Sequence, residues 1–209
     1  PEGKRYNTFV GYYRRLYGER LQKLVIDAGF TCPNRDGTVG RGGCSFCDNA
    51  AFHPSYSTSG KSIAEQIDEG IEFHQVRYRN TKHYLAYFQS YSNTYAPLPR
   101  LVELYSEALS HPSVVGIVIG TRPDCVDEEK LDWLASLKDG RALPGWRREG
   151  FGKPVVKIEY GIESCYDRTL ERVGRGHDVA AAVKALAMSA ERGLEPGAHF
   201  ILGLPGETR

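Results

Sequence analysis

Short apolar runs alternate with helix-like patterns along most of the chain. Five of these runs are rich in Val, Ile, Leu and aromatic residues without strict alternation, as in strands that are covered on both faces. They span residues 24–27, 84–89, 114–120, 155–160 and 198–202. Because helical patterns separate successive runs, we predict five parallel strands that form the interior and are joined by crossover helices.

Capping residues mark where these helices begin. Ser62 precedes isoleucines at fourfold spacing and has Glu65 at the capping-box position. Asp127 and Asp178 precede two later apolar patterns, and Pro97 opens another helix, because proline is tolerated in the first turn. These signals place one helix between each pair of predicted strands from the first to the fifth.

The number of strand–helix units limits the choice of fold. A complete eightfold barrel takes about 250 residues, whereas this chain has 209. We therefore predict an α/β fold of the partial (β/α) barrel type, truncated after the fifth strand, with a doubly wound sheet as the alternative. The chain begins at Pro1 and ends soon after the fifth run, so we interpret it as a fragment. It would comprise a basic N-terminal arm over residues 1–23 and a C-terminally incomplete core domain over residues 24–209.

Composition excludes several classes of protein. With 41% hydrophobic residues, 25% charged residues and a formal net charge of +1, the chain is neither disordered nor collagen-like. No apolar run approaches the roughly 18 residues that a membrane-spanning helix needs, and no export signal is present at the start. We expect a cytoplasmic protein that does not cross a membrane.

Three of the five cysteines lie close together after the first predicted strand. Cys44 and Cys47 form a C-x2-C pair, and a glycine-rich arm joins them to Cys32, so all three thiolates can reach one metal centre. Without an export signal, a disulfide is the weaker explanation. Three thiolates would leave one iron of a 4Fe-4S cluster open to another ligand. A zinc site completed by His53 is the structural alternative.

Further motifs lie at the ends of the predicted strands. They cover residues 27–37, 87–91, 120–124, 161–164, 175–177 and 203–208, and Phe46 stands directly before the last cysteine of the loop. In combination these stretches resemble the radical S-adenosylmethionine superfamily. More narrowly, they resemble its YhcC-like bacterial family, which is related to the catalytic subunit of Elongator.

The resemblance implies that Cys32, Cys44 and Cys47 hold a 4Fe-4S cluster whose open iron binds S-adenosyl-L-methionine. The chain would then be an enzyme that cleaves S-adenosylmethionine reductively to a 5'-deoxyadenosyl radical, which abstracts hydrogen from a substrate. The relationship to Elongator points to a tRNA base as that substrate. An external donor such as flavodoxin or ferredoxin would supply the electron. The alternative from another class is a zinc-stabilised, non-catalytic RNA-binding module.

The resemblance also implies which side chains contact S-adenosylmethionine. They are Phe46, Gln89, Tyr91, Arg122, Glu163, Ser164, Arg175 and Leu204. Arg175, assisted by Arg122, offers a guanidinium to the carboxylate, while Glu163 and Ser164 offer oxygens to the ribose hydroxyls. The stretch 89–93 replaces the Gly-Gly-Glu that the superfamily usually has after the second strand, and Gly120 replaces an acidic residue of the relatives.

Two other features have competing interpretations. Free cysteines mostly pack as small apolar residues, so we expect both Cys125 and Cys165 to be buried. The alternative for Cys165 is a hydrogen-atom donor to a substrate radical. Residues 1–23 carry six Lys or Arg, two Glu and four Tyr, a mixture that suits RNA. The simpler interpretation of this arm is an amphipathic segment packed on the rim of the barrel.

Overall fold

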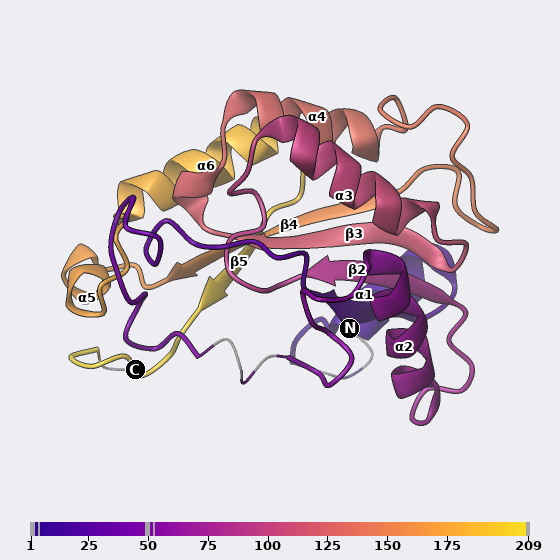
Figure 1. Cartoon of the computed structure of the whole chain (residues 1–209), viewed down its shortest axis with the longest axis horizontal. Helices are drawn as coiled ribbons and strands as arrows, with labels where there is room; N and C mark the ends of the chain where they lie inside the picture. The colour runs from indigo at the N-terminus through magenta and orange to yellow at the C-terminus, as the bar shows by residue number, and fades with distance from the viewer. Residues whose placement is uncertain (1–2, 4, 49–50, 52, 208–209) are drawn as a thin grey trace.

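Each strand of the sheet pairs with the next one along the chain, in the order β1-β2-β3-β4-β5, in a computed structural model of the protein (Figure 1). The structure describes residues 3, 5–48, 51 and 53–207. All four strand pairs are parallel. The strands are β1 (Leu21–Ile26), β2 (His83–Phe88), β3 (Val114–Thr121), β4 (Val155–Glu163) and β5 (Gly197–Phe200). The prediction of five parallel strands is confirmed.

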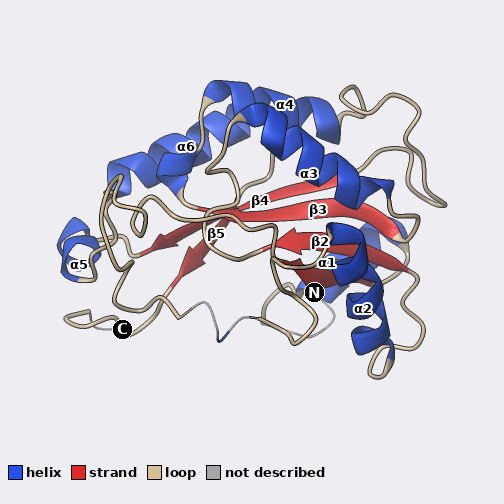
Figure 2. Cartoon of the chain, viewed as in Figure 1, coloured by secondary structure: helices blue, strands red, loops and turns tan. Residues whose placement is uncertain are grey.

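Four of the helices that connect the strands pack against one face of the sheet: α2 (Ile63–Gln75), α3 (Leu98–Ser110), α4 (Glu128–Lys138) and α6 (Val179–Glu191). The short α5 (Asp167–Arg172) lies beyond the end of β4 (Figure 1), and a 3-10 turn, η2, is at Pro123–Cys125. Figure 2 shows α3, α4 and α6 lying side by side over the strands. Residues of α2, α3, α4 and α6 share one apolar core with β1 to β4. Sequential strand order with these helices on one face is the arrangement of a barrel wall and excludes the doubly wound sheet.

The helix starts follow the predicted caps. The Ser62 hydroxyl accepts from the Glu65 amide at 3.2 Å, and the Glu65 carboxylate accepts from the Ser62 amide at 2.8 Å, which completes the capping box. Asp127 and Asp178 each accept a hydrogen bond from the amide three residues later, at 2.9 and 2.8 Å. Such caps stabilise a helix by roughly 1 kcal/mol each, and they depend only on local sequence.

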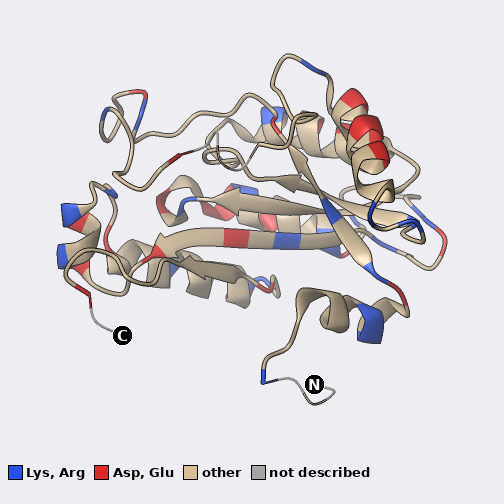
Figure 3. Ribbon diagram, turned by 90° about the horizontal axis from the view of Figure 1, so that it is seen from below, with Lys and Arg blue, Asp and Glu red and all other residues tan. Residues whose placement is uncertain are grey.

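The opposite face of the sheet carries a second, smaller apolar core at the amino ends of the strands. Helix α1 (Phe9–Tyr17) inserts Tyr13 there, against Leu21, Leu85 and Phe151. The basic residues of α1, blue in Figure 3, lie on its exposed side. The N-terminal segment is thus a packed amphipathic helix, and β1 begins at residue 21 rather than at the predicted residue 24. Contact with RNA stays a prediction.

The fifth strand differs from the prediction that all strands are covered on both faces. Its burial pattern is intermediate to exposed, with Phe200 49% exposed and Leu202, just after it, 93% exposed. Among the described residues β5 pairs only with β4, so it is an edge strand that leaves apolar side chains exposed. No described helix is long and apolar enough to span a bilayer.

Candidate functional site

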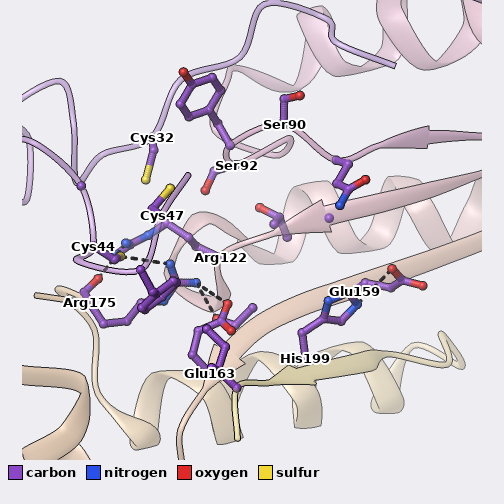
Figure 4. A pocket seen from close by; sticks show the side chains of 18 of the residues that line it. Cys32, Cys44, Cys47, Ser90, Ser92, Arg122, Glu159, Glu163, Arg175 and His199 are labelled. Carbon is purple, nitrogen blue, oxygen red and sulfur yellow. Dashed lines mark hydrogen bonds and ion pairs between the residues drawn. The ribbon is translucent and has the colours of Figure 1, made fainter. Parts of the chain in front are cut away.

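A cavity of about 330 Å³ opens where the strands end. Its walls come from the cysteine loop after β1, the loops after β2 and β3, and the strands β4 and β5 (Figure 4). On β4 the residues Glu159, Gly161 and Glu163 all face it, because alternate residues of a strand point to the same side. Barrel-type folds place their chemistry at this end of the strands.

All three cysteines of the loop line this cavity, and Figure 4 shows them grouped at one side of it. Cys32 and Cys44 are buried, Cys47 is half-buried, and none of them forms a disulfide. The loop is closed by its own backbone: the Cys32 carbonyl accepts from the amides of Arg35 and Asp36, and the Cys44 carbonyl accepts from the Cys47 amide at 3.0 Å. The fold therefore brings the predicted ligands together.

Two side chains donate hydrogen bonds to the sulfur of Cys44. The Asn34 amide lies 3.4 Å and the Arg175 guanidinium 3.5 Å from Sγ. Donors of this kind stabilise the charge on a ligating thiolate and tune the potential of an iron-sulfur centre. The donor set therefore fits three thiolates that each bind one iron of a cluster.

The zinc alternative fits less well. Among the described residues no three His, Cys, Asp or Glu side chains converge on a point that could hold one metal ion. His53, the predicted fourth ligand, uses its two ring nitrogens for Ser57 O at 3.2 Å and Ser90 Oγ at 2.9 Å. A cluster does not need such convergence, since its irons are separate and each takes one thiolate.

Arg122 and Arg175 line the cavity beside the cysteines, as Figure 4 shows, and hold each other in place. Arg122 is 2% exposed, donates to both carboxylate oxygens of Asp124 at 2.9 and 2.7 Å, and donates to the Arg175 carbonyl at 2.8 Å. Arg175 donates to His177 Nε2 at 2.9 Å and to the Gly161 carbonyl. In this arrangement most of the N–H groups of Arg122 already donate hydrogen bonds to acceptors within the protein.

Electrostatics and backbone geometry single out Glu163 and Tyr91. Burial raises the pKa of the Glu163 carboxyl, against the opposing charges of Arg175 and His199. Both Glu163 and Tyr91 have positive φ, at 72° and 63°. A side chain held in this left-handed region costs of order 1–3 kcal/mol, and such positions cluster at functional sites.

The remaining predicted contacts divide into two groups. Phe46, Gln89 and Tyr91 line the cavity. Ser164 and Leu204 are buried but are not among the residues that line it. The Ser164 hydroxyl accepts from the Tyr166 amide at 3.0 Å and donates to the Glu207 carboxylate. Ser164 lies just after β4, which ends at Glu163, and its hydroxyl is used by these two partners.

The two other cysteines also lie outside the cavity. The expectation that Cys165 is buried is wrong, because this residue is exposed and lines a separate hollow at the start of α5, beyond the end of β4. Its role as a hydrogen-atom donor stays a prediction. Cys125 is buried, as expected for a packing cysteine, and this burial raises the pKa of its thiol to about 12. A thiol of this kind stays neutral at physiological pH and is a poor metal ligand.

Sequence reasoning missed a charged cluster inside the barrel wall. Glu159 Oε1 accepts from Lys23 Nζ at 2.6 Å, and Glu159 Oε2 lies 3.1 Å from His199 Nε2. The Lys23 ammonium also lies 4.1 Å from the centre of the Tyr87 ring. One signal could have found it: the polar positions of β4 alternate with apolar ones, which indicates a polar inner face at its carboxyl end.

This cluster predicts how stability depends on pH. Burial alone would raise the pKa of Glu159, but the hydrogen bonds and charges of His199 and Lys23 outweigh it and lower the pKa to about 2, from 4.5. A carboxyl with a lowered folded-state pKa stabilises the fold at pH values above its unfolded pKa, and this contribution is lost as pH falls from about 4.5 towards 2.

We expect Glu159→Gln to flatten the loss of stability over this range, as measured by the urea midpoint at pH 7, 5, 4 and 3. Glu107→Gln, an exposed change on α3, should keep the wild-type profile; an equally flat profile for Glu107→Gln would contradict the assignment.

Comparison with known proteins agrees with this geometry. The profile of the Radical SAM superfamily matches residues 32–209. The chain is 42% identical to protein YhcC of Escherichia coli K12 over 202 residues, or 96% of this chain and 60% of that protein. It is 35% identical to protein YtqA of Bacillus subtilis over 212 residues, which cover 99% of this chain and 60% of YtqA. The chain thus spans about 60% of the length of these curated relatives.

More distant similarities lead to tRNA-modifying proteins. A tRNA uridine(34) acetyltransferase of Methanocaldococcus infernus is 27% identical over 94 residues, covering 45% of this chain and 15% of that protein. Among solved structures, the archaeal Elp3 of Methanocaldococcus infernus superposes with a TM-score of 0.60 at 16% identity, covering 90% of this chain and 39% of that one. This superposition shows a common fold. The profile match establishes that the chain belongs to the Radical SAM superfamily, and its sequence identities relate it to the YhcC and Elongator-type proteins.

Proposed function

We propose that the chain is the catalytic domain of a radical S-adenosylmethionine enzyme that modifies an RNA base. The observation that supports this most directly is that Cys32, Cys44 and Cys47 line one cavity together with Arg175 and Glu163. When bound there, a reduced 4Fe-4S cluster supplies one electron that splits S-adenosylmethionine into methionine and a 5'-deoxyadenosyl radical, which takes a hydrogen atom from the substrate.

The residues of this chain would hold and shield these groups. The three thiolates would ligate three irons, and the donors on Cys44 would stabilise the charge of the ligated sulfur. Glu163 lies close enough to Arg175, at 3.7 Å between Oε1 and Nη2, for a carboxylate and a guanidinium to meet complementary polar groups of one ligand. Because Arg122 and Arg175 are buried, this side of the cavity keeps water away from the reacting atoms.

A tRNA base as substrate is a proposal that rests on the relatives. Proteins named for tRNA uridine 34 match about 45% of this chain. The exposed arginines of α1 add positive charge that would favour a phosphate backbone. The electron would come from an external protein such as flavodoxin or ferredoxin, since the proposed ligand set provides for one cluster.

The test uses the full-length protein purified without oxygen. Iron and acid-labile sulfide are measured first, and then dithionite and S-adenosylmethionine are added and 5'-deoxyadenosine is sought by chromatography. We expect a brown protein that contains iron and sulfide and forms 5'-deoxyadenosine. A colourless protein with stoichiometric zinc and no 5'-deoxyadenosine would overturn the enzymatic proposal in favour of a zinc-stabilised RNA-binding module.

A further inference from the structure

The wall of the cavity that faces the cysteines carries Glu159 and His199, and Glu159 is bound by Lys23. Lys23 comes from β1, Glu159 from β4 and His199 from β5. Figure 4 shows Glu159 and His199 on the side of the cavity opposite Cys32, Cys44 and Cys47. A cofactor held at the cysteines would therefore have this cluster across the cavity from it.

The hydrogen bonds of the cluster leave one ring nitrogen available. Lys23 Nζ donates to one carboxylate oxygen of Glu159, and His199 Nε2 is hydrogen-bonded to the other. His199 Nδ1 has no hydrogen-bond partner among the described residues, while the side chain is 52% exposed and lines the cavity. A buried structural ion pair would be complete with Lys23 and Glu159 alone. Of the two members that line the cavity, Glu159 already has partners at both carboxylate oxygens, so His199 Nδ1 is the group left for a ligand.

The charges around His199 favour its protonated form. The hydrogen bond to Glu159 and the negative charges of Glu159 and Glu163 raise the pKa of His199. Burial and the positive charge of Lys23 lower it, but the net shift is upward. A protonated imidazole has two N–H groups. When Nε2–H donates to a carboxylate, Nδ1–H can still donate to a ligand.

We propose that His199, positioned by Glu159 and Lys23, binds an acceptor oxygen of the substrate through its Nδ1–H. This inference rests on the proposed function. It identifies the wall of the cavity that carries Glu159 and His199 as the part that recognises the substrate, here called the recognition wall. The aromatic rings of Tyr87 and Phe200 line the same cavity and can lie against a planar group. In a nucleotide the acceptor is either a carbonyl oxygen of the base or a phosphate oxygen. The two sources share one chemistry and can be separated by the choice of probe.

The experiment measures equilibrium binding to the full-length protein without reductant, by calorimetry, so its result does not depend on radical chemistry. The probes are uridine 5'-monophosphate, uridine and ribose 5-phosphate. We expect His199→Gln to weaken binding of uridine 5'-monophosphate at pH 7 by at least about tenfold, as for a hydrogen bond from a charged donor. A parallel loss with uridine would identify the base carbonyl, and a parallel loss with ribose 5-phosphate would identify the phosphate.

Glu159→Gln and pH provide the second readout. The pKa of His199 should fall without the carboxylate, so Glu159→Gln should also weaken binding at pH 7. Because the pKa of His199 is raised, the ratio of dissociation constants between His199→Gln and wild type should shrink only once the pH is raised far enough to deprotonate His199. The matched control is His83→Gln, which removes the histidine of another His–carboxylate pair, 2.7 Å from Glu19, at the amino end of β2.

The outcomes separate the two proposals. Unchanged binding in His199→Gln, no binding of any probe, or an equal loss in His83→Gln would overturn the role of His199. Wild-type protein that forms no 5'-deoxyadenosine yet shows the expected loss in His199→Gln would overturn the radical function and leave the recognition wall in place.

Discussion

Replacing Cys44 with alanine is expected to remove the bound iron and to lower 5'-deoxyadenosine formation by at least about 100-fold, since changes to groups that only support a metal ligand already cost up to about 100-fold. The variant deletes the thiol that accepts hydrogen bonds from Asn34 and Arg175. No other described cysteine is placed to replace it, because Cys125 and Cys165 do not line the cavity. Iron analysis and chromatography of the dithionite reaction measure both effects.

Cys125→Ala is the matched control for this prediction. It removes a buried thiol of the same chain, but one whose raised pKa keeps it neutral and whose side chain packs outside the cavity. Iron content and product formation should stay close to wild type. If both alanine variants lost iron equally while the wild type kept it, the loss would reflect general instability, and the assignment of Cys44 as a ligand would fail.

Sequence alone sufficed where structure is decided locally or by topology. The caps at Ser62, Asp127 and Asp178 depend on neighbours three residues away, and their helices begin where predicted. The cavity also follows from topology, because the carboxyl ends of parallel strands share one edge of the sheet. Cys44 and Arg175 therefore meet although 131 residues separate them.

The parts that sequence missed depend on long-range packing. Lys23 precedes residue 24, where the hydrophobic pattern places the start of the first strand, whereas β1 begins at residue 21 and carries Lys23 towards Glu159. The partnership of His199 with Glu159 is set by the register of β5 against β4, which pairs Gly161 with His199. Hydrophobic patterns do not determine such a register when the strand lies at an exposed edge.

The same limit applies to one partner of Arg122: Asp124 lies two residues away in the sequence, but the Arg175 carbonyl is brought to Arg122 by the tertiary structure. The resemblance implied that its guanidinium assists with the carboxylate of S-adenosylmethionine. The structure shows it bound to both carboxylate oxygens of Asp124 and to the backbone of Arg175. Arg122 is therefore placed to position the segment that carries Arg175, whether or not it also touches a ligand.

Removing Asp124 should consequently be among the most destabilising single changes in the chain. Arg122 is 2% exposed, and the side chain of Asp124, at 23% exposed, is its acidic partner at 2.7 Å. Asp124→Ala leaves a buried guanidinium without a counter-charge, which we expect to cost about 3 kcal/mol in the free energy of unfolding, measured by urea denaturation. Arg122→Met/Asp124→Ala should be less destabilised than the sum of its single variants, because no unpaired charge remains.

An exposed pair of the same type supplies the comparison. Arg141 and Asp139 lie 3.1 Å apart with side chains 70% and 53% exposed, so water screens them and Asp139→Ala should cost under about 1 kcal/mol. Equal effects of Asp124→Ala and Asp139→Ala would mean that Arg122 is not anchored by Asp124. The expected alternative is that only Asp124→Ala is destabilised and that it also loses 5'-deoxyadenosine formation under conditions where it remains folded. The Arg122–Asp124 pair then maintains the geometry of Arg175 beside Cys44. The stability of this side of the cavity and its chemistry would depend on the same contact.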